Sequence, residues 1–302
     1  FRRFDARSTI MAPLVARGRV VGVITLVRTG DGVPFDEDDL AMVEELAARA
    51  ALATDNGRLF HSRNRVARSL QEALLPPAMP VIDGLALASR YDVAEADVAI
   101  GGDFYDLMPV GPSAWGVVVG DVCGRGPDAA ALTGLVRHTL RSAVVREQAP
   151  SRVLRQTNQA MLQQIDDARF CTAAYLRVEL NEPRSGQVRV SASSAGHPRP
   201  VLVRTDGRAE LLDCAGTLLG VVSDPALSDV HVELGPGDAV VLYTDGVTEA
   251  RRGNELFGEA RLLTALESLA GRPAEEMASG LEAAVADFRR SASDDTAILV
   301  VQ

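Results

Sequence analysis

The sequence has 302 residues, of which 47 % are hydrophobic and 24 % charged, and its formal net charge is −10. This length fits one large domain or two unequal ones, and the hydrophobic content excludes a disordered chain. The acidic balance disfavours general nucleic-acid binding, which needs a basic face.

Cysteine usage and hydropathy indicate the compartment. The three cysteines, Cys123, Cys171 and Cys214, are too few and too scattered for a disulfide framework or a zinc site. We therefore expect a reducing, cytoplasmic environment. No apolar run reaches the roughly 18–20 residues that a membrane helix needs, so we expect no membrane partner. Because the sequence begins with Phe1 rather than methionine, we expect a piece of a longer protein, and a missing signal peptide carries little weight.

The first part of the chain predicts a hairpin and a long helix. Residues 10–28 predict two strands, the second partly alternating and rich in Val and Ile. Acidic residues at 36–39 suit the positive end of a helix dipole. Helical spacing then follows in Leu40, Val43, Ala47 and Ala50. The pattern can continue past Gly57 to Pro76, which would make a helix of roughly 40 residues and about 60 Å.

So long a helix with a narrow apolar stripe either pairs with another chain or packs along its own domain. We favour a linker helix that forms a homodimer; the alternative is one or two intramolecular helices with a break near Gly57. The hairpin, turn and helix resemble the C-terminal end of a GAF sensor domain, and the DNGRLF run at 55–60 is typical of where such domains continue into a signalling helix. We expect a GAF-like remnant at 1–55 and a linker helix at 56–79.

After residue 80 the pattern changes to runs of strands separated by pairs of helices. Strands are predicted at 85–94, 104–110, 115–122, 170–180, 187–196, 200–204, 229–234, 238–246 and 296–302. Helices are predicted at 126–147, about 150–166, 258–270 and 273–289. Strands in runs predict an α+β domain, not the strict alternation of a parallel sheet. We assign residues 80–302 to this domain.

Aspartates stand at the ends of apolar runs in this domain. Asp121 ends WGVVVG and Asp245 ends AVVLYT. Asp294 and Asp295 precede TAILVV, and Asp103 follows VAIGG. Several desolvated carboxylates that converge repel one another and raise their pKa values. A divalent cation relieves this repulsion, and Mg²⁺ and Mn²⁺ prefer hard oxygen ligands. A single Asp-Gly pair usually marks only a turn, but four such sites in one context predict a metal centre.

Five motifs carry a more specific resemblance. They are GGDFYD at 101–106, GDVCGRGPDAA, SSAGHPRP at 193–200, YTDGVTE and SDDTAILV. Their order and spacing resemble those of bacterial PPM-type (PP2C-like) serine/threonine phosphatases. The branch with the sporulation stage II and stress-response sigma-regulator phosphatases is most similar. The resemblance runs from about residue 80 to 302, and it implies a sandwich of two antiparallel β-sheets flanked by helix pairs.

The resemblance also implies roles for single residues. Asp121 would bridge two Mn²⁺ or Mg²⁺ ions, and the backbone carbonyl of Val122 would bind the second ion. Asp245 and Asp294 would complete the shell of the first. Asp103 would reach the second directly or through water. Asp103 and Asp121 would then be the catalytic residues, because two such cations lower the pKa of a shared water and hold it for in-line attack.

Neighbouring residues receive lesser roles. We expect Asp106 to be a turn or supporting residue, and Asp295 to support the centre because adjacent residues rarely aim at one ion. Arg125 stands near the place where eukaryotic relatives have a histidine. Arginine cannot donate a proton at neutral pH, so phosphate binding and a solvated loop position both stay open. We expect His197 to fix its turn against the sheet.

The resemblance implies a metal-dependent phosphatase for phosphoserine or phosphothreonine, with a small STAS-type anti-sigma-factor antagonist as substrate. One alternative is a catalytically weak or inactive dimeric scaffold of the same fold, which the complete aspartate set argues against. A nucleotide cyclase, suggested by GGDF, leaves TDGV and SDDT unexplained. The spacing of Cys171 and Arg177 matches cysteine phosphatases, but that stretch predicts a strand and not a phosphate loop.

Overall fold

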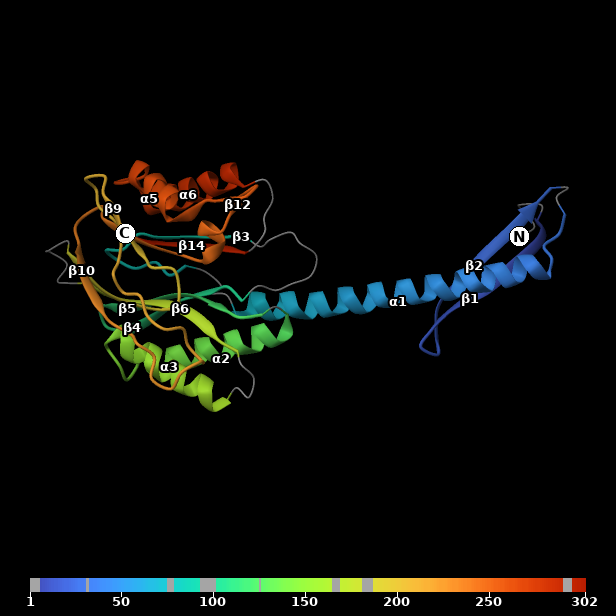
Figure 1. Ribbon diagram of the computed structural model, residues 1–302, viewed down its shortest axis with the longest axis horizontal. Helices are drawn as coiled ribbons and strands as arrows, with labels where there is room; N and C mark the ends of the chain where they lie inside the picture. The colour runs from blue at the N-terminus through green and yellow to red at the C-terminus, as the bar shows by residue number, and fades with distance from the viewer. Residues whose placement is uncertain are drawn as a thin grey trace. The chain divides into compact units, whose positions relative to one another are not determined.

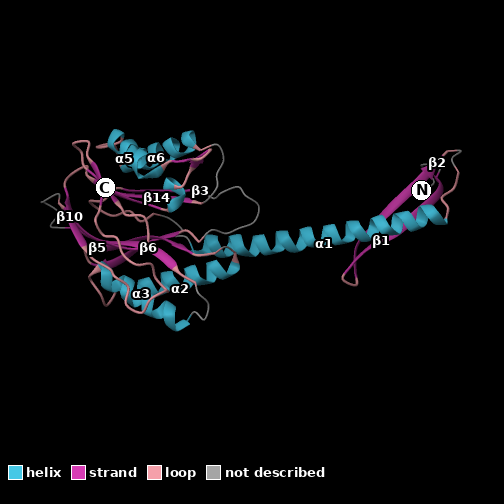
Figure 2. Ribbon diagram, in the orientation of Figure 1, coloured by secondary structure: helices cyan, strands magenta, loops and turns pink. Residues whose placement is uncertain are grey.

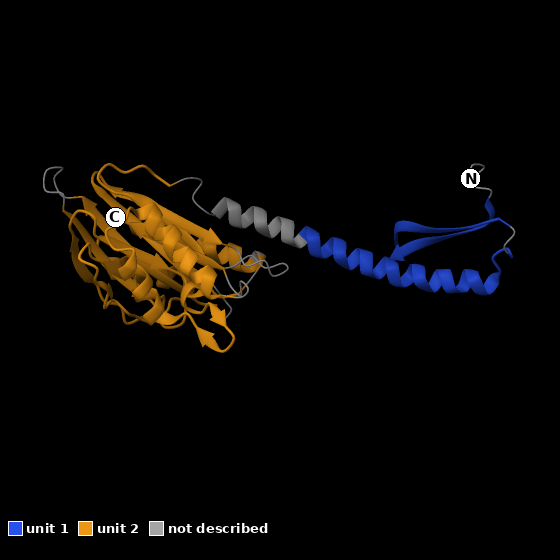
Figure 3. Cartoon of the chain, turned by 90° about the horizontal axis from the view of Figure 1, so that it is seen from above, with its two compact units in different colours: residues 1–66 blue, residues 67–302 orange. Residues whose placement is uncertain are grey.

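A computed structural model describes residues 6–30, 33–74, 79–92, 102–124, 126–164, 169–180, 187–289 and 295–302, without the side chains of residues 63–74 and 127. The chain forms two compact units, residues 1–66 and 67–302, which are coloured separately in Figure 3. Among the helices of these described ranges, none combines the length and the hydrophobicity that crossing a bilayer requires.

Unit 1 contains the predicted hairpin and the start of the long helix. Strands β1 (Ala6–Ala16) and β2 (Arg19–Thr29) pair antiparallel, and helix α1 covers Glu37–Leu74 without a break at Gly57. The side chain of Asp36 accepts a hydrogen bond from the backbone N–H of Asp39, and Asp39 accepts one from Asp36, which caps the helix start. One face of β1 packs against α1 through Ile10, Ala12, Val43 and Ala47.

Unit 2 is built on two five-stranded antiparallel sheets (Figures 1 and 2). The first has the order β10-β7-β6-β5-β4, with β4 (Phe104–Gly111), β5 (Ala114–Val122), β6 (Cys171–Leu180), β7 (Val188–Ala195) and β10 (Val230–Leu234). The second has the order β3-β14-β11-β8-β9, with β3 (Leu87–Asp92), β8 (Val201–Val203), β9 (Ala209–Leu211), β11 (Ala239–Tyr243) and β14 (Thr296–Val301).

Helices cover the outer faces of both sheets. Helices α2 (Pro127–Ala143) and α3 (Pro150–Gln164) pack on the first sheet, and α5 (Gly258–Ser268) and α6 (Ala274–Phe288) pack on the second (Figure 1). Two short elements were not predicted: a one-turn helix α4 (Asp245–Thr248) and a small hairpin of β12 (Arg251–Arg252) and β13 (Glu255–Leu256). The prediction of an α+β sandwich of two antiparallel sheets flanked by helix pairs is confirmed.

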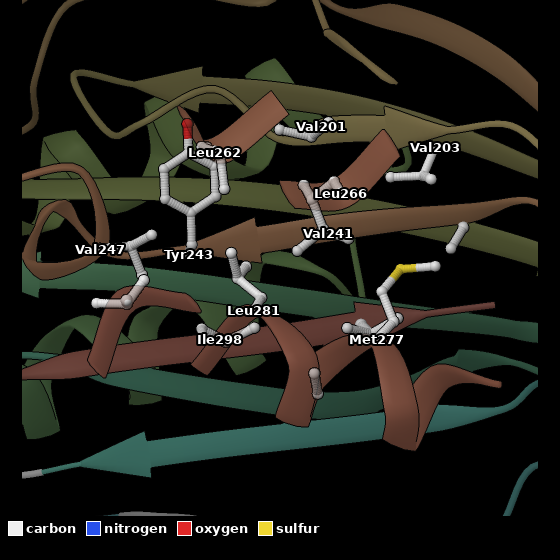
Figure 4. Packing of buried hydrophobic residues seen from close by; sticks show 14 of the residues in the cluster. Val201, Val203, Val241, Tyr243, Val247, Leu262, Leu266, Met277, Leu281 and Ile298 are labelled. Carbon is white, nitrogen blue, oxygen red and sulfur yellow. The ribbon is translucent and has the colours of Figure 1, made fainter. Parts of the chain in front are cut away.

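Three hydrophobic cores hold these layers together. Figure 4 shows the core between α5, α6 and the second sheet, where Tyr243, Leu262 and Leu281 are buried. A second core joins α2 and α3 to the first sheet. The third lies between the two sheets and contains Val119 and Leu242. Because side chains alternate along a strand, each inner strand supplies one set of residues to the interlayer core and the other to a helix layer.

Candidate metal centre

Strand alternation places polar residues at one end of the first sheet. Val119 of β5 and Ala174 of β6 face the interlayer core. The inward positions reached next at the strand ends are Asp121 and Thr172, which lie opposite each other in the β5–β6 register. Asp103 stands just before β4, whose first residue pairs with the residue before Asp121. Asp103, Asp121 and Thr172 therefore share the inner face at this end.

The second sheet becomes polar at its inner face in the same way. Leu242 of β11 faces the interlayer core, and the next inward position is Thr244, which is fully buried. The backbone N–H of Thr244 donates to Ala297 O at 3.0 Å, and the backbone N–H of Ala297 donates to Thr244 Oγ1 at 2.9 Å. Asp245 begins α4 directly after this pair, and Asp295 comes just before β14.

The pKa of Asp103 indicates that these stretches lie close together. Burial is the main cause that raises the pKa of Asp103 well above its usual value, and the charges of Asp121, Asp245 and Asp295 raise it further. A hydrogen bond from the Thr244 side chain to Asp103 opposes these effects in part. The four carboxylates come from four separate stretches of the chain. Asp103 and Asp295 are both buried.

Two glycines explain how the backbone fits around the carboxylates. A Cβ on Gly102 would lie 1.9 Å from the carbonyl oxygen of Val122 and 2.3 Å from an oxygen of Asp121. A Cβ on Gly246 would lie 2.0 Å from the carbonyl oxygen of Asp295. No side chain fits at either position, since real Cβ atoms do not approach so closely. The glycines of the GGD and TDG motifs are therefore required for close backbone approach.

The donor set suits a hard divalent cation. One carboxylate oxygen of Asp103 is buried without a hydrogen-bond partner among the described residues. Such an atom is costly unless a cation or water satisfies it. Carboxylate and backbone carbonyl oxygens are the ligands that Mg²⁺ and Mn²⁺ prefer. Within the described ranges no three histidine, cysteine or acidic side chains are arranged to hold an ion by themselves. Asp294, the fourth predicted carboxylate ligand, lies outside the described residues, as does Arg125.

Asp106 does not belong to this cluster. It lies inside β4, opposite Val118, and points to the helix side of the sheet. Its carboxylate is fully buried and accepts hydrogen bonds from Arg137 Nε at 3.0 Å and from Arg141 Nε at 2.7 Å. The prediction that Asp106 is a turn residue is wrong, because Asp106 lies within strand β4. Asp106 comes three positions after Asp103, and this odd spacing in an extended chain sends the two side chains to opposite faces.

His197 lies next to the centre as a neutral structural residue. Its Nδ1 is 2.9 Å from Thr172 Oγ1, and its backbone carbonyl accepts a hydrogen bond from the Ser194 hydroxyl at 2.7 Å. Burial lowers its pKa to about 3, and a backbone hydrogen bond with Tyr243 opposes the shift in part. His197 is therefore the neutral imidazole at neutral pH and not an imidazolium acid, which agrees with the predicted structural role.

Two hydroxyl residues escaped the sequence analysis. Thr172 and Thr244 stand beside the carboxylates, one on each sheet; Thr244 belongs to the YTDGVTE motif, whereas Thr172 belongs to none. The only available signal was position, because Thr244 directly precedes Asp245. The cysteine-phosphatase alternative fails: Cys171 and Arg177 both lie within strand β6, and Arg177 forms an ion pair with Glu179.

The family assignment rests on residues 111–302, which match the model of the stage II sporulation protein E (SpoIIE) family. The chain belongs to the SpoIIE family. Residues 1–54 match the GAF domain model. Both matches confirm the resemblances found in the sequence.

Named relatives agree with this assignment. The chain is 25 % identical to the phosphoserine phosphatase RsbU of Bacillus subtilis over 221 residues, which are 73 % of this chain and 63 % of RsbU. The chain spans about a third to two thirds of the length of the curated relatives it matches.

Two solved structures are similar in fold. The RsbU and RsbW domains of Rv1364c from Mycobacterium tuberculosis match with a TM-score of 0.60 and 28 % identity, over 72 % of this chain and 59 % of that one. The SiaA-PP2C domain of Pseudomonas aeruginosa matches with a TM-score of 0.68 and 23 % identity, over 83 % and 99 %. Family and fold together show that this SpoIIE-family chain has the PPM-type phosphatase fold.

Proposed function

We propose that this SpoIIE-family chain hydrolyses phosphoserine or phosphothreonine in a protein substrate and depends on two Mn²⁺ or Mg²⁺ ions. One observation carries the proposal: the buried Asp103 carboxylate lies among the charges of Asp121, Asp245 and Asp295, at one end of the space between the sheets. Four acidic side chains in such a place are tolerable when cations neutralise them. The GAF-like segment at 1–55 and the linker helix at 56–79 would precede the phosphatase domain at 80–302.

The proposed ligands are the carboxylates of Asp103, Asp121, Asp245 and Asp294 and the backbone carbonyl of Val122. When bound, the two ions would lower the pKa of a shared water and neutralise charge on the phosphoryl oxygens. Residues of the chain would fix the positions of the ligands. Asp121 would hold both ions from the end of β5. Gly102 lets the carbonyl of Val122 approach, and the Thr244 hydroxyl fixes Asp103 by a hydrogen bond.

The proposed substrate is a phosphorylated STAS-type anti-sigma-factor antagonist in the cytoplasm. The relative RsbU is a phosphoserine phosphatase, which supports cleavage of a phosphoserine ester by this chain. We also propose a homodimer through α1, with neither nucleic acid nor membrane as a partner. Large apolar side chains of α1 in unit 1 support the dimer because they are exposed: Leu40, Met42, Leu46, Leu52, Leu59 and Phe60. The inactive-scaffold alternative is not favoured, since named phosphatases are among the relatives.

A Mn²⁺ titration tests the proposed function. The full chain is assayed with p-nitrophenyl phosphate and with a phosphorylated STAS-domain protein, at several Mn²⁺ concentrations and after treatment with EDTA. Asp121→Asn and Asp245→Asn should lower kcat by about 1,000-fold, since metal catalysis contributes several kcal/mol. Both should also weaken Mn²⁺ binding measured by calorimetry. Asp287→Asn, an exposed position on α6, is the matched control and should behave as wild type.

Two results would refute the assignment. The first is full activity in Asp121→Asn while its circular dichroism spectrum stays native. The second is hydrolysis that EDTA does not change.

A further inference from the structure

Exposed apolar side chains gather beside the metal centre on three neighbouring segments. Leu162 near the end of α3, Phe170 before β6, and Val221 and Val222 in the loop after β9 are between 39 % and 57 % exposed. We name these four residues the apolar rim. Exposed apolar residues that cluster, unlike scattered ones, mark sites of interaction.

Backbone contacts bring the rim segments together. Asn158 lies one helical turn before Leu162, and its side chain donates to the carbonyl of Val222 at 2.9 Å. A Cβ on Gly220 would lie 3.5 Å from Cα of Phe170. Their neighbours Cys171 and Leu219 also pair, through reciprocal backbone hydrogen bonds of 2.8 and 3.0 Å. The loop, the strand start and the helix end are therefore in direct contact.

The loop that carries Val221 and Val222 is held rigidly although its side chains face outward. Asn158 is fully buried and uses both side-chain amide atoms on this loop, since its oxygen accepts the backbone N–H of Gly220 at 2.8 Å. Arg155 adds hydrogen bonds to the Asp224 side chain and to the carbonyl of Pro225. A backbone fixed in this way presents Val221 at little ordering cost when a partner binds.

One residue of the rim, Phe170, lies beside the segment that carries the metal centre. The backbone N–H of Cys123 donates to the carbonyl of Phe170 at 3.0 Å, and the N–H of Phe170 donates to Cys123 Sγ at 3.1 Å. Cys123 directly follows Val122, whose carbonyl is a proposed ligand. Phe170 and the centre thus lie at the same strand ends of the first sheet. A protein whose phosphoserine enters the centre places its own surface against this edge.

We infer that the apolar rim is a docking surface for the folded phosphoprotein substrate and contacts an apolar face beside its phosphoserine. The inference rests on the proposed function. Short-range apolar contact suits this task because a chain of net charge −10 offers no general attraction to a phosphoprotein. A small phosphate ester lacks the protein surface that the rim would contact. Rim residues therefore act on protein substrates alone.

Matched substrates separate docking from chemistry. Val221→Ser and Phe170→Ser are compared with Val145→Ser, which changes an 80 % exposed apolar residue after α2. Each variant of the full chain is assayed with a phosphorylated STAS-domain protein and with p-nitrophenyl phosphate. Val221→Ser should lower kcat/KM for the phosphoprotein about tenfold, through KM, as expected for an interface anchor. Its rate with the ester, and both rates of Val145→Ser, should stay at wild-type values.

A binding measurement keeps the inference separate from the proposed function. In an Asp121→Asn background, calorimetry gives the Kd of the phosphoprotein with and without Val221→Ser. An increase of about tenfold supports docking even if no variant hydrolyses the ester, a result that would overturn only the proposed function. An unchanged Kd overturns docking, as does an equal loss for both substrates. A change in mass by light scattering with an unchanged Kd would also overturn it, because the rim would then bind a second copy of this chain.

Discussion

The carbonyl oxygen of Val122 lies 1.9 Å from the point where a Cβ on Gly102 would stand. The contact joins the ends of β4 and β5, where the N–H of Val122 also donates to the carbonyl of Gly102 at 3.2 Å. Asp121 lies against the same point, with one carboxylate oxygen 2.3 Å from it. The positions of two proposed ligands therefore depend on the absence of one side chain.

Gly102→Ala should remove metal binding more than it removes stability. The added methyl group pushes the carbonyl of Val122 and the carboxylate of Asp121 away from residue 102, which displaces two proposed ligands. The loss of folding stability should be only about 1–3 kcal/mol, because a strand end can relax around the methyl group. We expect Mn²⁺ affinity and kcat to fall at least about 100-fold. Gly111→Ala at the far end of β4 is the control, because its Cβ would lie 3.4 Å from the nearest atom, Ala114 Cβ. Equal behaviour of the two variants would contradict the steric argument.

Thr244 should act through its hydroxyl. The hydroxyl donates to Asp103 on the first sheet and accepts the N–H of Ala297 on the second. Thr244→Val keeps the shape but leaves a buried N–H unsatisfied, which costs about 1–3 kcal/mol, and it releases Asp103. We expect weaker Mn²⁺ binding and roughly 10- to 100-fold lower kcat. Thr244→Ser retains the hydroxyl and should restore both. Loss of Mn²⁺ affinity in the serine variant as well would show that packing matters and not the hydroxyl.

Asp106 should stabilise the fold and should not bind metal. Its buried carboxylate holds Arg137 and Arg141 of α2, the latter also through a second hydrogen bond of 2.8 Å. Removing one partner of a buried ion pair costs about 3–5 kcal/mol. Asp106→Asn should therefore lower the urea midpoint strongly, while the Mn²⁺ Kd of the folded fraction stays unchanged. Asp128→Asn, whose side chain is largely exposed on α2, should change stability little. A selective loss of Mn²⁺ affinity in Asp106→Asn would contradict this assignment.

His197 should make the protein less stable in acid. Its pKa is about 3 in the folded state, below the ordinary value of 6.5. As pH falls below 6.5, the unfolded chain therefore binds a proton that the folded chain does not. The stability from this group is present above pH 6.5 and declines by up to about 1.4 kcal/mol per pH unit toward pH 3.

Urea unfolding between pH 5 and 8, with EDTA present, measures how the free energy of unfolding changes with pH. His197→Asn should make the free energy of unfolding depend less on pH, however much stability it loses at pH 8. His138→Asn, at an exposed position on α2, should leave this pH dependence unchanged. An unchanged slope in His197→Asn would mean that another group governs the acid sensitivity.

The sequence by itself determined the α+β architecture, and it indicated Asp103, Asp121 and Asp245 as members of one site. Period-two alternation, acidic strand ends and glycines beside Asp103 and Asp245 are local signals, so they can be read without knowing which strands pair. The same alternation could have separated Asp103 from Asp106, since an odd spacing in a strand sends side chains to opposite faces.

Only the tertiary structure decided what stands around these residues. Strand order and sheet stacking place Thr244 of one sheet against Asp103 of the other, and Asn158 of α3 under a loop more than sixty residues later in the chain. Such contacts join residues far apart in sequence. They form only when the chain has closed long loops and its layers have packed against each other. No local pattern encodes them. For that reason the partners of Asp106 and the apolar rim emerged only from the folded chain.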